Sequence, residues 1–581
     1  MAFGDLLEQV GSTGRFQVLH VTLLCMPILM MASHNLLQNF VASVPPHHCS
    51  VHRNLSLSRL SPEQVLLLTV PQDIKNSRPE RCLRYAAPQW QLLSENGTYS
   101  PKVERDSSDD TDDLLDAELQ GCKDGWEYSM TEMSSTIISE WDLVCDLRSL
   151  KQMGQTIYMG GVLVGAVIFG GLSDRFGRRF LLLISNLLMA VGGTCAAFST
   201  SFSVFCLFRF ITGMALSGLG LNSFSLIVEW IPTRVRTVVG TGTGYCYTMG
   251  QLILAVVAYF IRDWRWLTLA VSVPFYITFL YSWWFLESAR WLVLNRKSEQ
   301  AVKNLKTVAR INGRREEGDR INLEMLQDSM KKEMSCSLGS YSVVDLLRTP
   351  TMRNITICLS AVWFSTSFAY YGLSMDLQKF GVDIYLIQVI FGAVDIPAKV
   401  VVTVSMSIFG RRPSQCAALI LSGVTILINI LVPYEKQTVR TTLAVLGKGC
   451  LAASFNCCYL YSGELYPTVV RQNGMGWVSM MARVGAMVAP MVLLLGEAVP
   501  WLPGFIYGVA PILSGVVAIY LPETLGAPLP DTIQDVDERK VETQSQEQYN
   551  IEHCTRSSKV RMTPNCKLAS FIFFLSEVAR N

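Results

Sequence analysis

A short charged stretch, FGAVDIPAK at residues 391–399, lies inside a long apolar run and holds side chains that can bind an ion. Asp395 and Lys399 stand four residues apart, so on a helix they share one face with Phe391. An acid four residues before a base is the favoured order for an ion pair. Two interpretations stay open: an inert Asp395–Lys399 pair, or an acid that holds Lys399 until an anion takes it. Pro397 cannot donate to the carbonyl of Ala393, which predicts a kink.

Three further cations are predicted to lie in apolar segments, where an ionisable group costs about 3 kcal/mol and often marks a ligand pathway. Arg483 is flanked by methionines and has no obvious partner in its own helix, so another segment or a bound anion has to neutralise it. Arg209 and Lys448 sit beside glycines, in FRFITG and LGKGC. We predict that these two cations serve helix packing.

A polar face is predicted near the N-terminus. Met31, Asn35 and Asn39 follow one another at intervals of four, so they line one side of a helix, with His34 beside them. Amides in apolar segments often only hydrogen-bond neighbouring helices. The face therefore predicts either helix packing or ligand contact, with ligand contact favoured for the two asparagines.

Aromatic side chains form a second face, which Trp363, Tyr370 and Tyr371 share. Such a stripe is usually packing, but Tyr370 lies too deep for a belt of aromatic residues at a helix end. Ring edges and phenolic O–H groups suit flat, amphipathic anions.

Two more aromatic pairs are candidates. Phe455 and Tyr459 lie one turn apart in a later segment. Tyr245 and Tyr247 point about 200° apart on a helix, so only one of them can face inward.

Long apolar blocks have to position all these side chains. The chain has 581 residues, of which 50% are hydrophobic and 17% charged. A block of about 20 apolar residues crosses the hydrocarbon core of a membrane as a helix. Twelve such blocks begin near Arg15, Lys151, Phe180, Ser203, Thr237, Arg265, Met352, Asp383, Pro413, Val439, Gln472 and Pro503. The sequence therefore predicts an all-α polytopic membrane protein. Its net charge of +2 gives no case for nucleic acid, and it has neither a Walker-type loop nor zinc-ligand spacing.

Basic residues in the short loops set the predicted orientation. One set of loops carries Arg175, Arg178, Arg179, Arg234, Arg236, Arg411, Arg412 and Arg471, and the alternate loops balance their few basic residues with acids. The basic set is predicted to be cytoplasmic, and an even number of spans then leaves both termini there. The predicted division is an N-terminus 1–14, a first span 15–43, an extracellular loop 44–150, spans two to six 151–287, a cytoplasmic loop 288–350, spans seven to twelve 351–522 and a largely disordered cytoplasmic tail 523–581.

The long loop 44–150 agrees with an extracellular, oxidising location. It holds glycosylation sequons at Asn54 and Asn96. It also holds an even number of cysteines, for which we predict disulfides: Cys49, Cys82, Cys122 and Cys145. Four cysteines allow three pairings, and the sequence does not choose among them.

The two halves of the chain echo each other at a nearly fixed offset. EWIPTRVR at 229–236 recurs as ELYPTVVR at 464–471, FGRR at 176–179 recurs at 409–412, and LES at 286–288 recurs as PET at 522–524. The repeat predicts two six-helix bundles related by an axis along the membrane normal, with a site at their interface near the midplane. That arrangement is typical of a transporter.

Specific motifs extend this reading to a family. GGLSDRFGRR at 170–179 resembles the loop between the second and third spans of the major facilitator superfamily. The resemblance implies close helix packing at the glycines and a charge lock between Asp174 and the arginines, with gating residues Gly170, Asp174, Arg175, Gly177, Arg178 and Arg179. With ESARWL at 287–292 and PETLGAPLPDTIQD at 522–535, the chain resembles the organic cation/anion/zwitterion transporters, solute carrier family 22.

Longer blocks place the resemblance in one branch. MASHNLLQNF, YLIQVIFGAVDIPAK and GELYPTVVRQNGMG are similar to the organic anion branch, close to the renal organic anion transporters, and the match covers about residues 1–535. The chain departs from the pattern at Leu286, where proline is usual, and in its tail after about 540.

The resemblance implies a function without catalysis or cofactor. A polyspecific organic anion transporter of the plasma membrane would exchange external anions for an intracellular dicarboxylate such as 2-oxoglutarate by alternating access. The implied ligands are sulfate conjugates, aromatic carboxylates, dicarboxylates and urate, and membrane lipid surrounds the protein. An organic cation or zwitterion carrier anchored on Asp395, or a non-transporting scaffold or receptor with the same fold, stays as an alternative.

The resemblance also assigns roles within the site. It favours Tyr247 over Tyr245, and it makes Lys399 and Arg483 the charge anchors, because relatives that carry cations tend to have an acid at the position of Arg483. Close relatives have phenylalanine in place of Tyr459, so the hydroxyl of Tyr459 is expected to shift selectivity.

Overall fold

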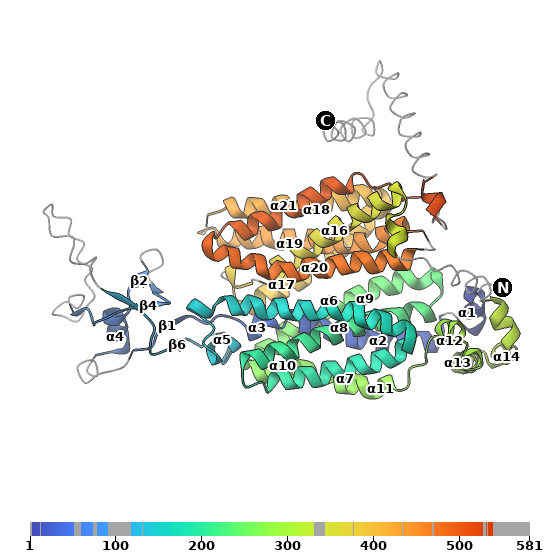
Figure 1. Ribbon diagram of the computed structural model, residues 1–581, viewed down its shortest axis with the longest axis horizontal. Helices are drawn as coiled ribbons and strands as arrows, with labels where there is room; N and C mark the ends of the chain where they lie inside the picture. The colour runs from blue at the N-terminus through green and yellow to red at the C-terminus, as the bar shows by residue number, and fades with distance from the viewer. Residues whose placement is uncertain are drawn as a thin grey trace, which may run out of the picture.

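Two bundles of helices lie side by side in the computed structural model of the chain (Figure 1). The N-terminal bundle, blue to green, contacts the C-terminal bundle, yellow to red, along their length. The structure describes residues 3–11, 13–51, 60–73, 78–90, 118–130, 132–329, 343–375, 377–380, 382–433, 435–467, 470–526, 530 and 533–537.

The N-terminal bundle holds the first six predicted spans. Its helices are α2 (Arg15–Leu36), α6 (Ser149–Phe176), α7 (Arg178–Ala197), α8 (Phe202–Trp230), α9 (Thr233–Phe260), α10 (Trp264–Ser272) and α11 (Pro274–Ser282). The sixth span is divided between α10 and α11 because Pro274 has no N–H and interrupts the hydrogen-bond ladder. Val273 keeps helical dihedrals at the break, so the path of the span continues.

The C-terminal bundle holds the other six. Its helices are α16 (Pro350–Ser374), α17 (Ile384–Ile408), α18 (Arg411–Leu431), α19 (Gln437–Leu465), α20 (Arg471–Ala498) and α21 (Leu502–Ala518). α17 is one helix across Pro397, and the kink at this residue stays a prediction.

The helices have the lengths and surfaces of a multi-pass membrane protein. Nine helices in the described ranges are long and apolar enough to cross a membrane. The other three predicted spans are the divided α10–α11 pair, the 25-residue α16 with its many Ser, Thr and Tyr side chains, and the 17-residue α21. Large apolar side chains cover the outside, and Trp284 and Leu431 are each 82% exposed, as lipid contact requires.

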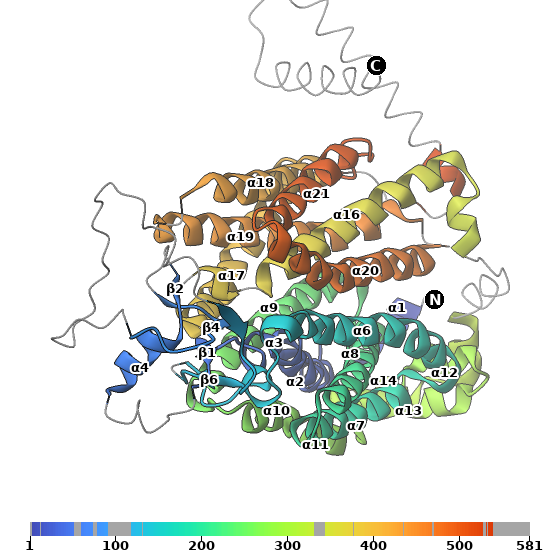
Figure 2. The same ribbon diagram turned by 60° about the vertical axis from the view of Figure 1, so that its left-hand side comes forward.

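Two pairs of helices form the seam between the bundles. α6 packs on α20, and α9 packs on α17 (Figure 2).

Within the N-terminal bundle, α6 approaches α8 closely at Gly161 and Gly165, where an added Cβ would lie 2.2 and 2.4 Å from the carbonyl oxygens of Phe210 and Met214. Gly170 was expected to permit such an approach, but a Cβ there would meet no atom within 4 Å. The expectation for Gly170 is wrong in this conformation because the close contacts of α6 lie roughly one and a half and two and a half turns earlier, at Gly165 and Gly161.

A small cystine-linked unit projects from one end of the bundles, at the left of Figure 1. Three two-stranded sheets pair β1 (His47–Cys49) with β6 (Trp126–Tyr128), β2 (Gln72–Asp73) with β3 (Arg78–Pro79), and β4 (Leu83–Tyr85) with β5 (Leu119–Gly121). The short helices α4 (Pro62–Thr69) and α5 (Ile137–Glu140) accompany them. The helix α3 (Gln38–Val41) continues the first span after α2, and the turn η2 (Cys145–Leu147) leads into α6. We call this end of the protein the loop end.

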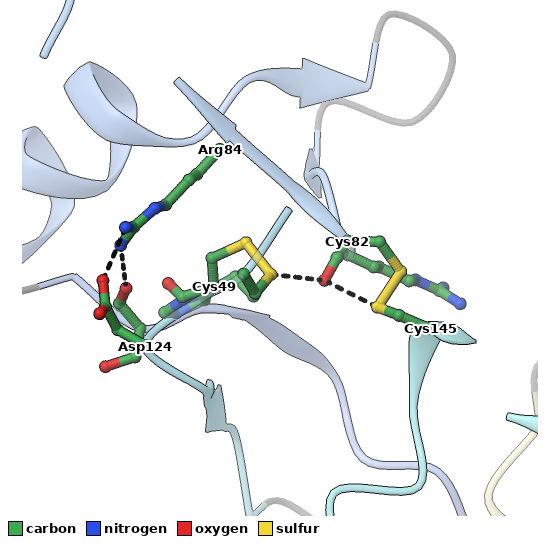
Figure 3. Close-up of a disulfide and its surroundings, with 9 residues drawn as sticks. Cys49, Cys82, Arg84, Asp124 and Cys145 are labelled. Carbon is green, nitrogen blue, oxygen red and sulfur yellow. Dashed lines mark hydrogen bonds and ion pairs between the residues drawn. A yellow bond between two sulfur atoms is a disulfide. The ribbon is translucent and has the colours of Figure 1, made fainter. Parts of the chain in front are cut away.

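The structure selects one of the three disulfide pairings. Cys49 bonds Cys122, and Cys82 bonds Cys145 (Figure 3). Beside them Arg84 forms an ion pair with Asp124 at 2.6 Å. The predicted glycosylation sites at positions 54 and 96 lie outside the described residues.

Short helices cover the opposite end of the N-terminal bundle: α1 (Phe3–Gly11), α12 (Ala289–Leu294), α13 (Ser298–Ile311) and α14 (Arg315–Asp319). We call it the arginine end, because the turns that contain Arg178 and Arg411 lie there. Asn312 joins these helices: its Nδ2 donates to the carbonyls of Val10 and Gly11 at 3.0 Å, and its Oδ1 accepts from the N–H of Phe16 at 2.9 Å. One amide thus connects the end of α1 and the start of α2 to the end of α13. The turns η3 (Val343–Leu347) and η4 (Leu377–Phe380) complete the described elements.

Candidate functional site

A buried ion pair lies in the middle of the C-terminal bundle. Lys448 on α19 donates to Asp395 on α17 at 2.7 Å, and the two side chains are 2% and 3% exposed. The same ammonium donates to the carbonyl of Phe391 at 2.7 Å. Asp395 therefore pairs with Lys448 and not with Lys399, which corrects the predicted pair. The i,i+4 spacing brings Lys399 to the same face as Asp395, but the facing helix α19 supplies a lysine that reaches the carboxylate directly.

Lys399 extends toward the other bundle. Its Nζ donates to the carbonyl of Gly244 at 2.7 Å and to the hydroxyl of Thr248 at 2.8 Å, both on α9. The ammonium also lies 5.5 Å from the centre of the Tyr245 ring. The side chain is half-buried, so Lys399 is held by neutral groups and stays within reach of a ligand.

Tyr370 connects the ion pair to the N-terminal bundle. Its hydroxyl donates to Asp395 at 3.3 Å and accepts from the amide of Gln251, on α9, at 3.2 Å. The Lys448 ammonium lies 4.8 Å from the centre of the Tyr370 ring. Tyr370 is 7% exposed, so in this conformation it is buried and supports the site through these two hydrogen bonds.

Asn35 forms hydrogen bonds with two tyrosine hydroxyls on the N-terminal side of the seam. Its Nδ2 donates to Tyr247 at 2.9 Å, and its Oδ1 accepts from Tyr158 at 3.0 Å. Tyr247 in turn is in hydrogen-bond contact with Tyr371 on α16. Because Tyr247 bridges Asn35 and Tyr371 while Tyr245 lies under Lys399, both tyrosines border the seam.

The other predicted residues near the first span have different neighbours. Met31 is half-buried, and its sulfur would lie 3.3 Å from a Cβ added at Gly220 on α8. Arg209 is 1% exposed, donates to the carbonyl of His34 at 3.3 Å and stacks on the Tyr158 ring at 4.1 Å. Arg209 and His34 are thus buried inside the N-terminal bundle.

Arg483 on α20 is the second cation at the seam that a ligand can reach. It is half-buried, and its guanidinium donates to the carbonyl and hydroxyl of Ser479, one turn earlier in its own helix. The phenols of Tyr459 and Tyr371 lie within electrostatic range of the guanidinium. In the described part of the chain, no carboxylate lies within ion-pair distance of Arg483 or Lys399.

Aromatic rings line the C-terminal side. Trp363 donates to the hydroxyl of Ser462 at 2.8 Å and is 2% exposed. Its ring meets Tyr459 edge-on at 4.7 Å and Phe455 at 6.3 Å between centroids. Tyr459 is 54% exposed, whereas Trp363, which packs against its ring, is buried.

Hydrogen bonds join the bundles at the loop end. Asn39 donates to the carbonyl of Ser374 at 2.9 Å, and Gln378 exchanges two bonds with the backbone of Val44 at 3.0 and 3.3 Å. Tyr385 on α17 donates to the carbonyl of Glu132 at 2.7 Å. Asn39 therefore takes part in closing this end rather than lying beside Asn35 in one ligand-binding face.

A charge network occupies the arginine end of the N-terminal bundle. Arg178 pairs with Asp174 at 3.0 Å and with Glu229 at 3.4 Å. The carboxylate of Glu287 accepts from the N–H groups of Arg178 and Arg179 at 3.2 and 3.0 Å. Burial raises the pKa of Glu287, and these N–H bonds oppose that effect. Arg175 is exposed and lies 5.5 Å from the ring centre of Phe176, outside the network.

The C-terminal bundle repeats this network. Glu523 accepts from the N–H groups of Arg411 and Arg412 at 2.9 and 3.0 Å, and Arg411 pairs with Glu464 at 3.1 Å. Gly177 and Gly410 both have positive φ, +98° and +103°, and a Cβ at either would collide with the capping glutamate. The repeat in the sequence is therefore a repeat in hydrogen bonding.

Several residues of the site were not singled out from the sequence. Glu229, Glu287, Glu464 and Glu523 open or lie within the repeated motifs, so the repeat itself was a usable signal. Thr248, Gln251 and Tyr158 had no such signal, because a single polar residue in a span does not show which helix it faces.

Comparisons with known proteins agree with this architecture. The sequence profile of the sugar (and other) transporter family matches residues 102–534. Relatives called "Solute carrier family 22 member 6" are 76% identical over 539 residues in Danio rerio and 50% identical over 539 residues in Rattus norvegicus. Both alignments cover 93% of this chain and 95% of the relative.

Solved structures support the fold alone. The inward open conformation of the xylose transporter XylE from E. coli is 19% identical, with a TM-score of 0.53, over 66% of this chain and 88% of that one. XylE bound to 6-bromo-6-deoxy-D-glucose, described as a major facilitator superfamily proton:xylose symporter, is 20% identical with a TM-score of 0.50, over 66% and 88% of the two chains.

Proposed function

This chain belongs to solute carrier family 22 within the sugar (and other) transporters of the major facilitator fold, a family of transporters and not of enzymes, and we propose that it carries small organic anions across the plasma membrane. The ligand classes in the proposal are sulfate conjugates, aromatic carboxylates, dicarboxylates and urate. External anions would be exchanged for an intracellular dicarboxylate such as 2-oxoglutarate.

One observation carries the choice of anions: the balance of charge at the seam. Asp395 is buried and already neutralised by Lys448 at 2.7 Å. Lys399 and Arg483 remain, both half-buried and held by neutral acceptors. The seam therefore keeps two positive charges in a low-dielectric setting, which favours an anion. The same burial argues against a cation carrier anchored on Asp395.

The surrounding rings suit broad specificity. Tyr459 and Tyr371 present apolar ring surface and phenolic hydroxyls beside Arg483, and Phe455 packs against Trp363 and Tyr370. A charge anchor next to aromatic walls selects for charge and size more than for detailed shape.

The paired bundles support alternating access. The loop end, which we propose is extracellular, is closed by the bonds of Asn39, Gln378 and Tyr385. The arginine end, which we propose is cytoplasmic together with both termini, carries the two equivalent charge networks. Rocking of one bundle against the other would expose the seam to each side in turn.

Uptake in a heterologous cell tests the proposal. Cells expressing the protein should take up estrone sulfate in preference to an organic cation, and preloading with 2-oxoglutarate should increase the rate. Lys399→Ala and Arg483→Ala should each reduce uptake at least tenfold at normal surface level, because each removes a charged partner of the anion. Arg348→Ala is the matched control, since Arg348 is 77% exposed and its ion-pair partner is Asp345, three residues earlier. Normal uptake in both seam variants, or faster uptake of the cation, would refute the proposal.

A further inference from the structure

We propose that Lys399 is a latch between the two bundles, that the transported anion opens it, and that Thr248 is the residue that positions it. The inference rests on the exchange function proposed above and explains why the empty protein would not change conformation freely. It concerns the state seen here, in which the loop end is closed.

The latch crosses the seam. Lys399 belongs to α17 of the C-terminal bundle, and its two acceptors, the Gly244 carbonyl at 2.7 Å and the Thr248 hydroxyl at 2.8 Å, belong to α9 of the N-terminal bundle. The Asp395–Lys448 pair, by contrast, lies wholly within the C-terminal bundle. A charged group therefore links the bundles near the midplane at Lys399 and not at the ion pair.

Thr248 is arranged as an acceptor. Its hydroxyl donates to the Gly244 carbonyl at 3.3 Å, so its lone pairs are left to accept from Lys399. The side chain of Thr248 is fully buried, which fixes the hydroxyl in this position. Thr248 and the Gly244 carbonyl thus form a two-point seat for one ammonium group.

An anion can displace this seat. Both seat atoms are neutral, whereas a carboxylate or sulfate adds the attraction of a full negative charge to its hydrogen bond with the ammonium. Lys399 is half-buried, so a ligand at the seam can reach its ammonium. Once the ammonium turns to the anion, α9 and α17 lose their charged connection.

Exchange follows from this competition. A ligand shifts a conformational equilibrium only by its differential interaction with the two states. Without an anion the seat stabilises the conformation with the loop end closed, so the return step is slow. With an anion on the inner side the seat is vacated and the bundles can move. The latch therefore couples outward movement of the protein to an internal anion.

Influx measurements test the latch, because after each inward delivery the empty protein has to leave the conformation that the seat stabilises. Uptake of labelled estrone sulfate is measured into cells preloaded with 2-oxoglutarate and into cells that are not preloaded. In the unmodified protein, preloading should accelerate uptake several-fold. Thr248→Val keeps the shape but removes the hydroxyl, so uptake without preloading should rise about tenfold and the acceleration should largely disappear. Thr248→Ser, which keeps the hydroxyl, should retain the acceleration.

Control and outcomes separate this inference from the proposed function. Thr243→Val is the matched control on α9, because the Thr243 hydroxyl donates to the Val239 carbonyl at 2.9 Å. If the unmodified protein exchanges but Thr248→Val shows the same acceleration at equal surface level, the latch is refuted and exchange stands. If the unmodified protein shows no acceleration, exchange is refuted and the latch with it. Should Thr248→Val not reach the surface, Thr248→Ala is judged by the same criterion.

Discussion

Neutralising Asp395 is the most direct test of how the charged centre of the C-terminal bundle is held together. Asp395→Asn leaves the Lys448 ammonium, 2% exposed, without its counter-charge and with neutral acceptors alone, the Phe391 carbonyl and the new amide oxygen. The variant therefore creates an uncompensated charge in the interior. The question is which lysine, Lys448 or Lys399, is left without a counter-charge in this variant.

The geometry sets the magnitude. At 2.7 Å and an effective dielectric constant of about 20, the attraction between Asp395 and Lys448 is about 6 kcal/mol. Part of it offsets the cost of removing both charges from water, and breaking such a pair by deleting one partner costs about 3–5 kcal/mol. Asp395→Asn should lose that amount. Asp395→Asn/Lys448→Met should recover most of it, because both charges are then gone, whereas Asp395→Asn/Lys399→Met should recover little.

The assay is thermal unfolding of the detergent-solubilised protein, with surface biotinylation as a second measure. Asp395→Asn should unfold several degrees below the unmodified protein and reach the surface poorly, and Lys448→Met as the second change should restore both. Rescue by Lys399→Met instead would show that the sequence-predicted pair exists after all. An unchanged unfolding temperature in Asp395→Asn would refute the buried ion pair altogether.

Three further outcomes follow from the contacts described. Tyr370→Phe, which removes the hydroxyl between Gln251 and Asp395, should cost about 1 kcal/mol, seen as a lower unfolding temperature; no change would mean that this hydroxyl bridges nothing. Glu287→Gln and Glu523→Gln each remove the charge and one of the two acceptor oxygens that cap two backbone N–H groups, so the two variants should lower the unfolding temperature to a similar extent; a loss in only one would contradict their equivalence. Peptide mapping without reduction should link position 49 to 122 and position 82 to 145, and any other linkage would contradict the loop structure.

Much of the architecture is readable from the sequence, and the reason is local. A block of about 20 apolar residues has to be a helix in a membrane, because no water is present to satisfy its backbone. The FGRR repeat likewise marks two equivalent turns, each with a glycine at positive φ and a glutamate that caps the following arginines.

Side-chain partners across helices are not readable in this way. The i,i+4 spacing made Lys399 the natural partner of Asp395, yet Lys448, 53 residues further along the chain, takes that place. Which helix faces which is decided by packing of the whole bundle, and neither hydropathy nor spacing encodes it. The same limit kept Thr248 out of the predicted site, although its hydroxyl is one of the two acceptors for Lys399.

The Asn312 junction has a consequence for the timing of synthesis. Asn312 is made 296 residues after Phe16, whose N–H it accepts, so at about 5–20 residues per second α1 waits roughly 15–60 s for its partner. Throughout that interval Leu6, Leu7 and Val10, which are at most 2% exposed in the finished protein, have nothing to cover them. We expect the nascent α1 to rest on the membrane surface with this apolar side down, as amphipathic helices do, until α13 emerges and Asn312 draws it in. The helix α1 would then be made first but would be among the last segments to pack into the folded protein.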